Sequence, residues 1–144
     1  MLTDPSILNL LLVEDSDDDA FFFLRALDKA ELGCSVNRAF NGAEAIEFLE
    51  AARTSNAQKL PSAMFLDLKM PILNGFEVLD WVRTHDFASQ IRIVVLSGSD
   101  HEGDKQRAAQ LGAFDYLVKP IRVAHLERVL RDLCPAKQET GVHS

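Results

Sequence analysis

The chain has 144 residues, of which 47% are hydrophobic and 26% are charged, and its formal net charge is -7 at pH 7. This composition is typical of one soluble globular domain, and the negative charge disfavours nonspecific nucleic-acid binding, which needs a basic surface. No stretch approaches the roughly 20 apolar residues of a membrane span, and the N-terminus lacks the basic region of a signal peptide. We therefore expect a cytoplasmic protein that binds neither nucleic acid nor membrane.

Apolar runs alternate with amphipathic stretches five times along the chain. The strands are expected at 7–13, 34–40, 63–68, 91–96 and 114–118, and the helices from Ser16 or Asp17 to about Leu32 and at 43–53, 76–85, 104–111 and 123–134. This alternation predicts an α/β fold with a parallel sheet between two layers of helices, that is, a doubly wound (βα)5 sheet of five strands. We expect one domain at 7–134, an N-terminal extension at 1–6 and a flexible C-terminal tail at 135–144.

The expected first helix contains three consecutive phenylalanines. An inward stripe would consist of Ala20, Phe23, Leu24 and Leu27. Because a helix cannot direct three consecutive side chains inward, Phe22 and Phe21 should be partly exposed. Their exposure indicates a partner surface, a homodimer contact or isolated exposed aromatics, and the sequence leaves these alternatives open.

Chemically reactive side chains follow four of the five expected strands. Glu14 and Asp15 follow the first strand, Asp67 ends the third, Ser97 follows the fourth and Lys119 follows the fifth. In open α/β sheets, ligands bind outside the carboxyl ends of the strands, where the strand order reverses. We therefore expect three carboxylates, one hydroxyl and one ammonium to converge on one edge.

Three carboxylates at close range repel one another, so a hard divalent cation such as Mg²⁺ is the expected companion. Asp17, Asp18 and Asp19 have a simpler explanation, because negative charge in the first turn of a helix complements its dipole. With a cation present, the Asp67 carboxylate can act as a nucleophile toward phosphorus. Lys119 would supply positive charge, and Ser97 would donate a hydroxyl hydrogen bond to a phosphoryl oxygen.

Four motifs in order resemble the receiver domain of two-component response regulators. They are VED at 13–15, FLDLKMP at 65–71 followed by NGFE, VVLSGS at 94–99 and YLVKP at 116–120. The resemblance extends over about 7–133 and implies the flavodoxin-like receiver fold.

The resemblance also implies a role for each matching residue. Asp67 would be the phospho-acceptor, and Asp15 a direct Mg²⁺ ligand together with Asp67 and the backbone carbonyl of Lys69. Glu14 would act on the metal through water. Ser97 and Lys119 would contact the phosphoryl group, and Tyr116 would be the aromatic switch that swings inward when Ser97 moves. The Lys119–Pro120 bond would be cis.

The expected function is that of a stand-alone response regulator that assists its own phosphorylation and dephosphorylation without being a turnover enzyme. The implied donor is a sensor histidine kinase, and the connection at 51–61 is similar to that of small regulators associated with phytochrome kinases. Because the sequence ends about ten residues after the last helix, we expect no DNA-binding output domain. The signal would pass to a downstream protein or to a phosphotransfer protein.

Three other functions share this architecture or chemistry. A haloacid-dehalogenase-type phosphatase also forms an aspartyl phosphate, but it needs a second Asp where this chain has Lys69. A flavodoxin-like FMN protein needs a hydroxyl-rich loop after the first strand, where carboxylates would repel its ligand. A degenerate receiver that serves only as a scaffold would not need the complete set of Asp15, Asp67, Ser97 and Lys119.

Overall fold

The computed structural model describes residues 8–54, 60–85, 87 and 90–133. In this part of the chain, strands and helices alternate as the sequence predicts. Their bounds are β1 Leu8–Val13, α1 Asp17–Ala30, β2 Cys34–Ala39, α2 Gly42–Thr54, β3 Ala63–Asp67, α3 Gly75–Thr84, β4 Arg92–Ser97, α4 Glu102–Gln110, β5 Asp115–Val118 and α5 Val123–Asp132. The expected extension at 1–6 and tail at 135–144 lie outside the described residues, so the domain boundaries stay a prediction.

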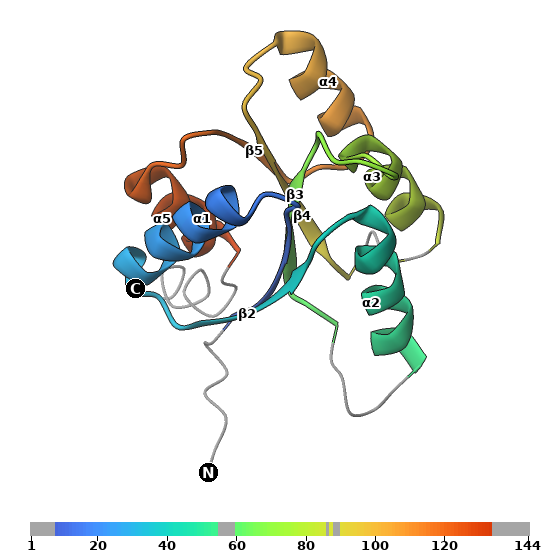
Figure 1. Ribbon diagram of the computed structural model, residues 1–144, viewed down its shortest axis with the longest axis horizontal. Coiled ribbons are helices and arrows are strands. Elements are labelled where there is room, and N and C mark those ends of the chain that lie inside the picture. Colours follow the sequence, from blue (N-terminus) through green and yellow to red (C-terminus); the bar gives the residue numbers. More distant parts are fainter. Residues whose placement is uncertain (1–7, 55–59, 86, 88–89, 134–144) are drawn as a thin grey trace, which may run out of the picture.

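The described strands form one five-stranded sheet in the order β2-β1-β3-β4-β5, and every neighbouring pair is parallel. Helices α1 and α5 cover one face, and α2, α3 and α4 cover the other, which gives three layers (Figure 1). The expected doubly wound α/β fold is therefore confirmed. The strand order reverses between β1 and β3, so the carboxyl ends of these two strands mark the point where a ligand is expected.

Each face of the sheet has its own hydrophobic core. On the side of α1 and α5, Phe23 packs against Phe65 with ring centroids 4.9 Å apart, within a cluster that also includes Leu126. On the other side, Leu49, Val78 and side chains of the central strands form the second cluster. All five residues of β3 are buried, as expected for a strand covered on both faces. This packing holds the end of β3, and with it Asp67, in a fixed place.

Local side-chain chemistry sets where the helices begin and end. The Ser16 side chain accepts a hydrogen bond from the Asp19 N–H at 3.2 Å and caps α1, as predicted. Asn74 and Glu77 form a capping box at the start of α3. Helix α1 ends at Ala30, two residues before the predicted end, because Glu31 takes the left-handed conformation with φ 56°.

The buried stripe of the first helix differs from the predicted one at Leu24. Leu24 is 41% exposed, so its predicted place in the core is wrong. The buried residues of α1 include Ala26 and Ala30 in place of Leu24, and the complete stripe is Ala20, Phe23, Ala26, Leu27 and Ala30. Phe21 and Phe22 are 56% and 60% exposed, which confirms the prediction that only Phe23 of the three is buried.

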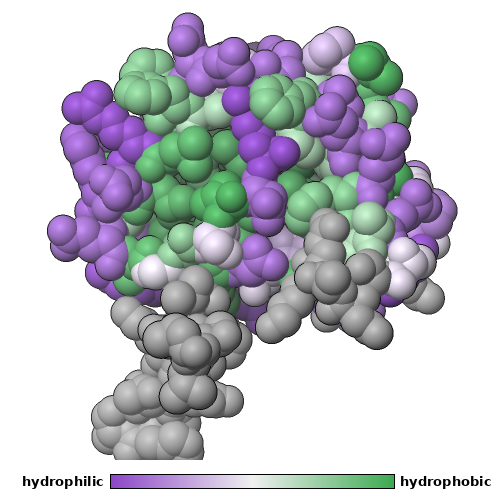
Figure 2. Space-filling view, turned by 60° about the horizontal axis from the view of Figure 1, so that its bottom comes forward, coloured by the Kyte–Doolittle hydropathy of each residue, from purple (hydrophilic) through white to green (hydrophobic). Residues whose placement is uncertain are grey.

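On the face drawn in Figure 2, hydrophobic side chains gather in patches between hydrophilic ones. Among the described residues, no helix combines the length and the apolar character that crossing a membrane requires.

Candidate functional site

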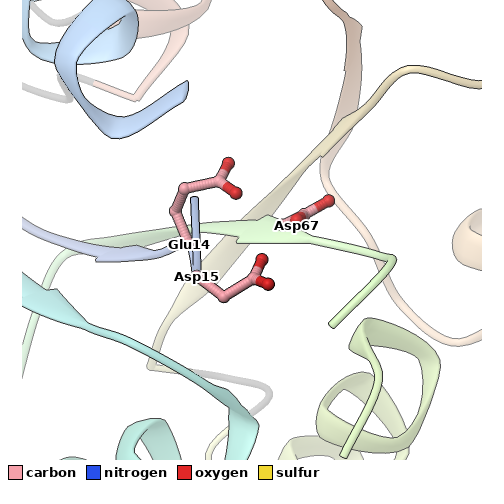
Figure 3. Close-up of side chains that lie close together, drawn as sticks. All are labelled: Glu14, Asp15 and Asp67. Carbon is pink, nitrogen blue, oxygen red and sulfur yellow. The ribbon is translucent and has the colours of Figure 1, made fainter. Parts of the chain in front are cut away.

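The carboxylates of Glu14, Asp15 and Asp67 gather at the carboxyl edge of the sheet (Figure 3). Val13 is the register partner of Leu66, so the residues that follow β1 and the last residue of β3 come side by side. One carboxylate oxygen from each of the three residues lies within 4.8 Å of the others. Glu14 and Asp67 are only 1% and 5% exposed, whereas Asp15 is exposed. The three carboxylates therefore lie together at one edge of the sheet, as predicted, at the border between the buried interior and solvent.

Lys119 follows β5 and directs its ammonium group toward these carboxylates. Its Nζ lies 2.9 Å from Glu14 Oε1, 2.8 Å from Asp19 Oδ2 and 3.6 Å from Asp67 Oδ1. The Lys119–Pro120 peptide bond is cis, as the resemblance implied. The predicted convergence of Lys119 with the acidic residues is thus observed, but the lysine lies closer to Glu14 and Asp19 than to Asp67.

Ser97 is the last residue of β4 and is buried next to the ends of β3 and β5. Its backbone carbonyl accepts a hydrogen bond of 2.7 Å from the Lys119 N–H. Its Oγ accepts one of 3.0 Å from the N–H of Ser99. The hydroxyl predicted to serve the site is therefore at the expected edge of the sheet, where it also anchors the loop after β4.

Tyr116 is half-buried on β5, and its hydroxyl donates a hydrogen bond of 2.9 Å to the Ser99 carbonyl. The Ser99 hydroxyl in turn donates to Asp104 Oδ2 of α4 at 2.8 Å, and it accepts a hydrogen bond from the His101 N–H. Through Ser99, the loop after β4 is thus bonded to both α4 and β5.

The loop between β3 and α3 is held close to Asp67. The Lys69 N–H donates to Asp67 Oδ1 at 3.3 Å, and the Gly75 N–H donates to the Leu68 carbonyl at 3.0 Å. A Cβ atom at Gly75 would lie 2.6 Å from the Asp67 carbonyl oxygen, so a glycine is required where α3 starts. This fold-back keeps the loop that carries the Lys69 carbonyl beside the carboxylates.

Burial and neighbouring charges shift two pKa values in the site. The pKa of Asp67 is raised to about 7, chiefly by burial; the positive charge of Lys119 opposes this rise, and the negative charge of Glu14 adds to it. Burial alone would lower the pKa of Lys119, but hydrogen bonds to Asp19 and Glu14 outweigh burial and raise it. Lys119 is therefore charged in the physiological range, and it offsets only part of the repulsion among the carboxylates.

The donor set fits a hard divalent cation. Three carboxylates offer oxygen ligands within a short distance of one another, and Mg²⁺ prefers oxygen ligands with one or two carboxylates among them. Burial, with a smaller contribution from the negative charge of Glu14, raises the pKa of Asp67, and a cation bound beside this carboxylate would favour its ionised form.

Three further residues belong to this site and were missed in the sequence. Asp19 was assigned only to the helix dipole, and Ser99 was assigned only to a loop. Arg38 of β2 donates from Nε and Nη2 to the Glu14 carbonyl at 3.1 and 2.9 Å, and its Nη1 pairs with Asp17 at 3.0 Å. Arg38 could have been found from the sequence, because β2 adjoins β1 and the ends of neighbouring parallel strands lie together.

A doubly wound sheet with a lysine and three carboxylates at its switch point defines a receiver-type domain. Residues 10–131 match the model of the response regulator receiver domain, and the chain belongs to this family. The receiver domain is a module of two-component signalling systems, and aspartyl phosphate and Mg²⁺ are typical of the family. Neither the phosphatase alternative nor the FMN-binding alternative is favoured by this result.

The chain is also similar to individual relatives over most of its length. It is 32% identical to an uncharacterized 14.6 kDa protein of Leptolyngbya boryana, over 88% of this chain and 90% of that protein. The bacteriophytochrome response regulator AtBRR has a similar structure, with 33% identity, a TM-score of 0.75 and coverage of 88% of this chain and 92% of that chain.

A second structural neighbour contains a metal. The response regulator Rcp1, described in its Mn²⁺-bound form, is 26% identical to this chain with a TM-score of 0.70, over 88% of this chain and 91% of that chain. Receiver domains bind Mg²⁺ or Mn²⁺ at an acidic pocket, and this chain has an acidic cluster made of Glu14, Asp15 and Asp67.

Proposed function

We propose that this chain is a response regulator that accepts a phosphoryl group on Asp67 from a histidine kinase. The observation that carries the proposal is the setting of Asp67, a buried carboxylate within 4.8 Å of two others and 3.6 Å from an ammonium group. A buried carboxylate with a raised pKa beside a lysine is an arrangement that perturbs reactivity and favours a functional role over a structural one.

In the proposed reaction, one Asp67 oxygen forms a bond to the phosphorus of a phosphohistidine. The bond between phosphorus and the imidazole nitrogen breaks, and its electron pair stays on that nitrogen. The histidine leaves as a neutral imidazole, because its other ring nitrogen already carries a proton. The product is the mixed anhydride of the Asp67 carboxyl group and phosphate. Because nucleophile and phosphoryl group are both anionic, positive charge must lie at the point of contact, and Lys119 provides it.

Asp15, Asp67 and the backbone carbonyl of Lys69 would hold Mg²⁺ directly, and Glu14 would act on it through water. When bound, the ion neutralises negative charge on the carboxylates and on the phosphoryl oxygens. Glu14 contributes in a second way, because its Oε1 accepts a hydrogen bond from Lys119 and so keeps the ammonium group at the site.

Ser97 and Tyr116 would convert the modification into a change of shape. The added phosphoryl group brings about -1.5 to -2 of charge and strong acceptor oxygens, which attract the Ser97 hydroxyl. Ser97 Oγ now accepts from the Ser99 N–H, and Ser99 is bonded to Tyr116. A movement of Ser97 would therefore release the loop after β4, and Tyr116 would swing inward.

The phosphodonor would approach along a hollow of about 550 Å³ beside α1, which is lined among others by Asp19, Phe22, Lys119 and Pro120. The exposed Phe22 ring at this hollow is suited to contact a partner protein. We propose a bacterial sensor kinase as the donor, and the likeness to AtBRR makes a phytochrome kinase the first candidate. The output would be contact with a downstream protein or transfer of the phosphoryl group to a phosphotransfer protein.

A phosphotransfer assay tests this proposal. A purified histidine kinase is first labelled with radioactive phosphate and is then mixed with this protein and Mg²⁺. We expect label to move to the wild type and not to an Asp67→Asn variant that melts as cooperatively as the wild type. Equal labelling of both proteins would refute the assignment.

A further inference from the structure

The resting position of Lys119 is set by a residue outside the expected phosphorylation set. Asp19 Oδ2 lies 2.8 Å from Lys119 Nζ, whereas Asp67 Oδ1 lies 3.6 Å from it. An ammonium group has three protons to donate, and here the shortest contacts go to Asp19 and to Glu14 at 2.9 Å. The lysine is therefore held by α1 and the end of β1 more tightly than by Asp67.

The backbone around Asp19 is fixed, and its side chain is accessible. Its N–H donates to Ser16 Oγ, which caps α1. Glu14 uses both of its oxygens, Oε1 for Lys119 and Oε2 for the Ser16 N–H at 3.3 Å, and it is buried. The Asp19 side chain is 40% exposed, so water can replace Lys119 as its partner. Of the two short contacts of Lys119, the one to Asp19 is thus the easier to break.

We propose that Asp19 is a positioning residue that draws Lys119 away from Asp67 in the resting state and competes with an incoming phosphoryl group for it. This inference rests on the proposed function, because it assumes that Lys119 contacts the phosphoryl group. Its physical basis is competition between anions for one cation at short range, where each opposite charge lowers the free energy of the ammonium. A phosphoryl group on Asp67 adds negative charge, which attracts the Lys119 ammonium group away from Asp19.

The competition predicts opposite effects on two ligands. If Asp19 loses its charge, Lys119 moves closer to Asp67 and repels a cation bound there. Mg²⁺ should then bind more weakly, whereas beryllium fluoride, an anionic mimic of the phosphoryl group, should bind more tightly. For a half-exposed ion pair we expect a change on the order of fivefold in each dissociation constant.

The test compares Asp19→Asn with Asp18→Asn. Both residues lie in the first turn of α1, so both substitutions remove one unit of charge near the same helix dipole. Of these two residues, only Asp19 forms one of the described ion pairs with Lys119. Mg²⁺ affinity is measured by calorimetric titration of the metal-free protein. Beryllium fluoride affinity is measured by fluorine NMR at saturating Mg²⁺, and thermal melting reports on folding.

We expect Asp19→Asn to bind Mg²⁺ more weakly and beryllium fluoride more tightly than Asp18→Asn, with similar melting temperatures. Equal affinities in the two variants would overturn the role of Asp19 and leave the proposed function intact. Failure of the wild type to bind beryllium fluoride would instead count against the proposed function itself. If Asp19→Asn does not fold, the same comparison is made between Asp19→Ser and Asp18→Ser, because serine is well tolerated at the start of a helix.

Discussion

The Tyr116 hydroxyl donates a hydrogen bond of 2.9 Å to the backbone carbonyl of Ser99, a residue in the loop after β4. The N–H of the same Ser99 donates to Ser97 Oγ at 3.0 Å, and its hydroxyl donates to Asp104 of α4. The Tyr116 side chain on β5 is thus connected to the Ser97 hydroxyl, at the carboxyl edge of the sheet, through a single residue. This connection is a physical route by which a change at Ser97 can reach α4 and β5.

Removal of the Tyr116 hydroxyl should loosen the loop after β4. A Tyr116→Phe variant loses one hydrogen bond, which corresponds to about 1 kcal/mol of local stability. We expect faster amide hydrogen exchange at 98–101 in the unphosphorylated protein, with Mg²⁺ affinity unchanged because Tyr116 does not contact the carboxylates. Exchange as slow as in the wild type would mean that this hydrogen bond does not hold the loop.

Asp67 should destabilise the metal-free protein at neutral and alkaline pH. Its pKa is about 7 in the folded protein against an ordinary value of 3.8, so the folded state binds more protons than the unfolded state between these values, and stability falls as the pH rises through that window. An Asp67→Asn substitution removes the ionisable group and therefore the free-energy cost of holding a charged carboxylate in this buried place. At pH 8 without metal we expect the variant to exceed the wild type by about 1 kcal/mol or more in the free energy of unfolding.

Urea denaturation of the wild type and of Asp67→Asn is measured from pH 5 to 8 in the presence of a chelator. The difference between their free energies of unfolding isolates the effect of Asp67 ionisation from that of other titrating groups. The difference should grow with pH, and Mg²⁺ should reduce it by stabilising the wild type alone. A difference that does not change with pH would contradict the explanation by burial and repulsion.

Arg38 should maintain the shape of the acidic turn after β1. Its guanidinium donates twice to the Glu14 carbonyl and pairs with Asp17. In an Arg38→Met variant these charged hydrogen bonds are lost, and we expect a loss of roughly 1–3 kcal/mol in stability and weaker Mg²⁺ binding. Calorimetric Mg²⁺ titration of the folded variant checks the second effect, and wild-type affinity would show that the turn keeps its shape without Arg38.

Phe22 should contribute to recognition of a protein phosphodonor and not to the chemistry. Phe22 lines the hollow beside Lys119, and Phe21 is as exposed but is not among the lining residues, so Phe21→Ala is a matched control for Phe22→Ala. We expect Phe22→Ala to slow phosphotransfer from a histidine kinase about tenfold, as for an aromatic contact at an interface. Labelling by acetyl phosphate should be unaffected, and an equal effect of both substitutions on transfer would exclude a specific contact.

The order of the elements and the convergence of Glu14, Asp15, Asp67, Ser97 and Lys119 could be predicted because both follow from a simple rule. The hydrophobic runs define parallel strands, and parallel strands place their carboxyl ends at one edge. Leu24 was placed wrongly because a helix of this pattern can bury a stripe on either side of Phe23, and only the packing of α1 against α5 decides between them. The end of α1 was misjudged because the glycine at position 33 is the stronger sequence signal for a helix end, whereas the left-handed conformation that ends the helix is taken by Glu31.

The contacts that the sequence could not reveal are those that depend on side-chain reach. Asp19 is a helix-dipole residue by sequence position, and its contact with Lys119, 100 positions later, depends on how α1 packs against α5 and the sheet. Ser99 was indistinguishable from any loop serine until the structure placed Ser97, Tyr116 and Asp104 around it.

The central claim is that Asp67 accepts a phosphoryl group, and intact-mass spectrometry tests it most directly. The protein is incubated with acetyl phosphate and Mg²⁺, and the modified position is located by reduction with borohydride followed by peptide sequencing. We predict one phosphoryl group per chain, located at Asp67, dependent on Mg²⁺ and absent from Asp67→Asn. A phosphoryl group at another residue, or one that persists in that variant, would contradict the account.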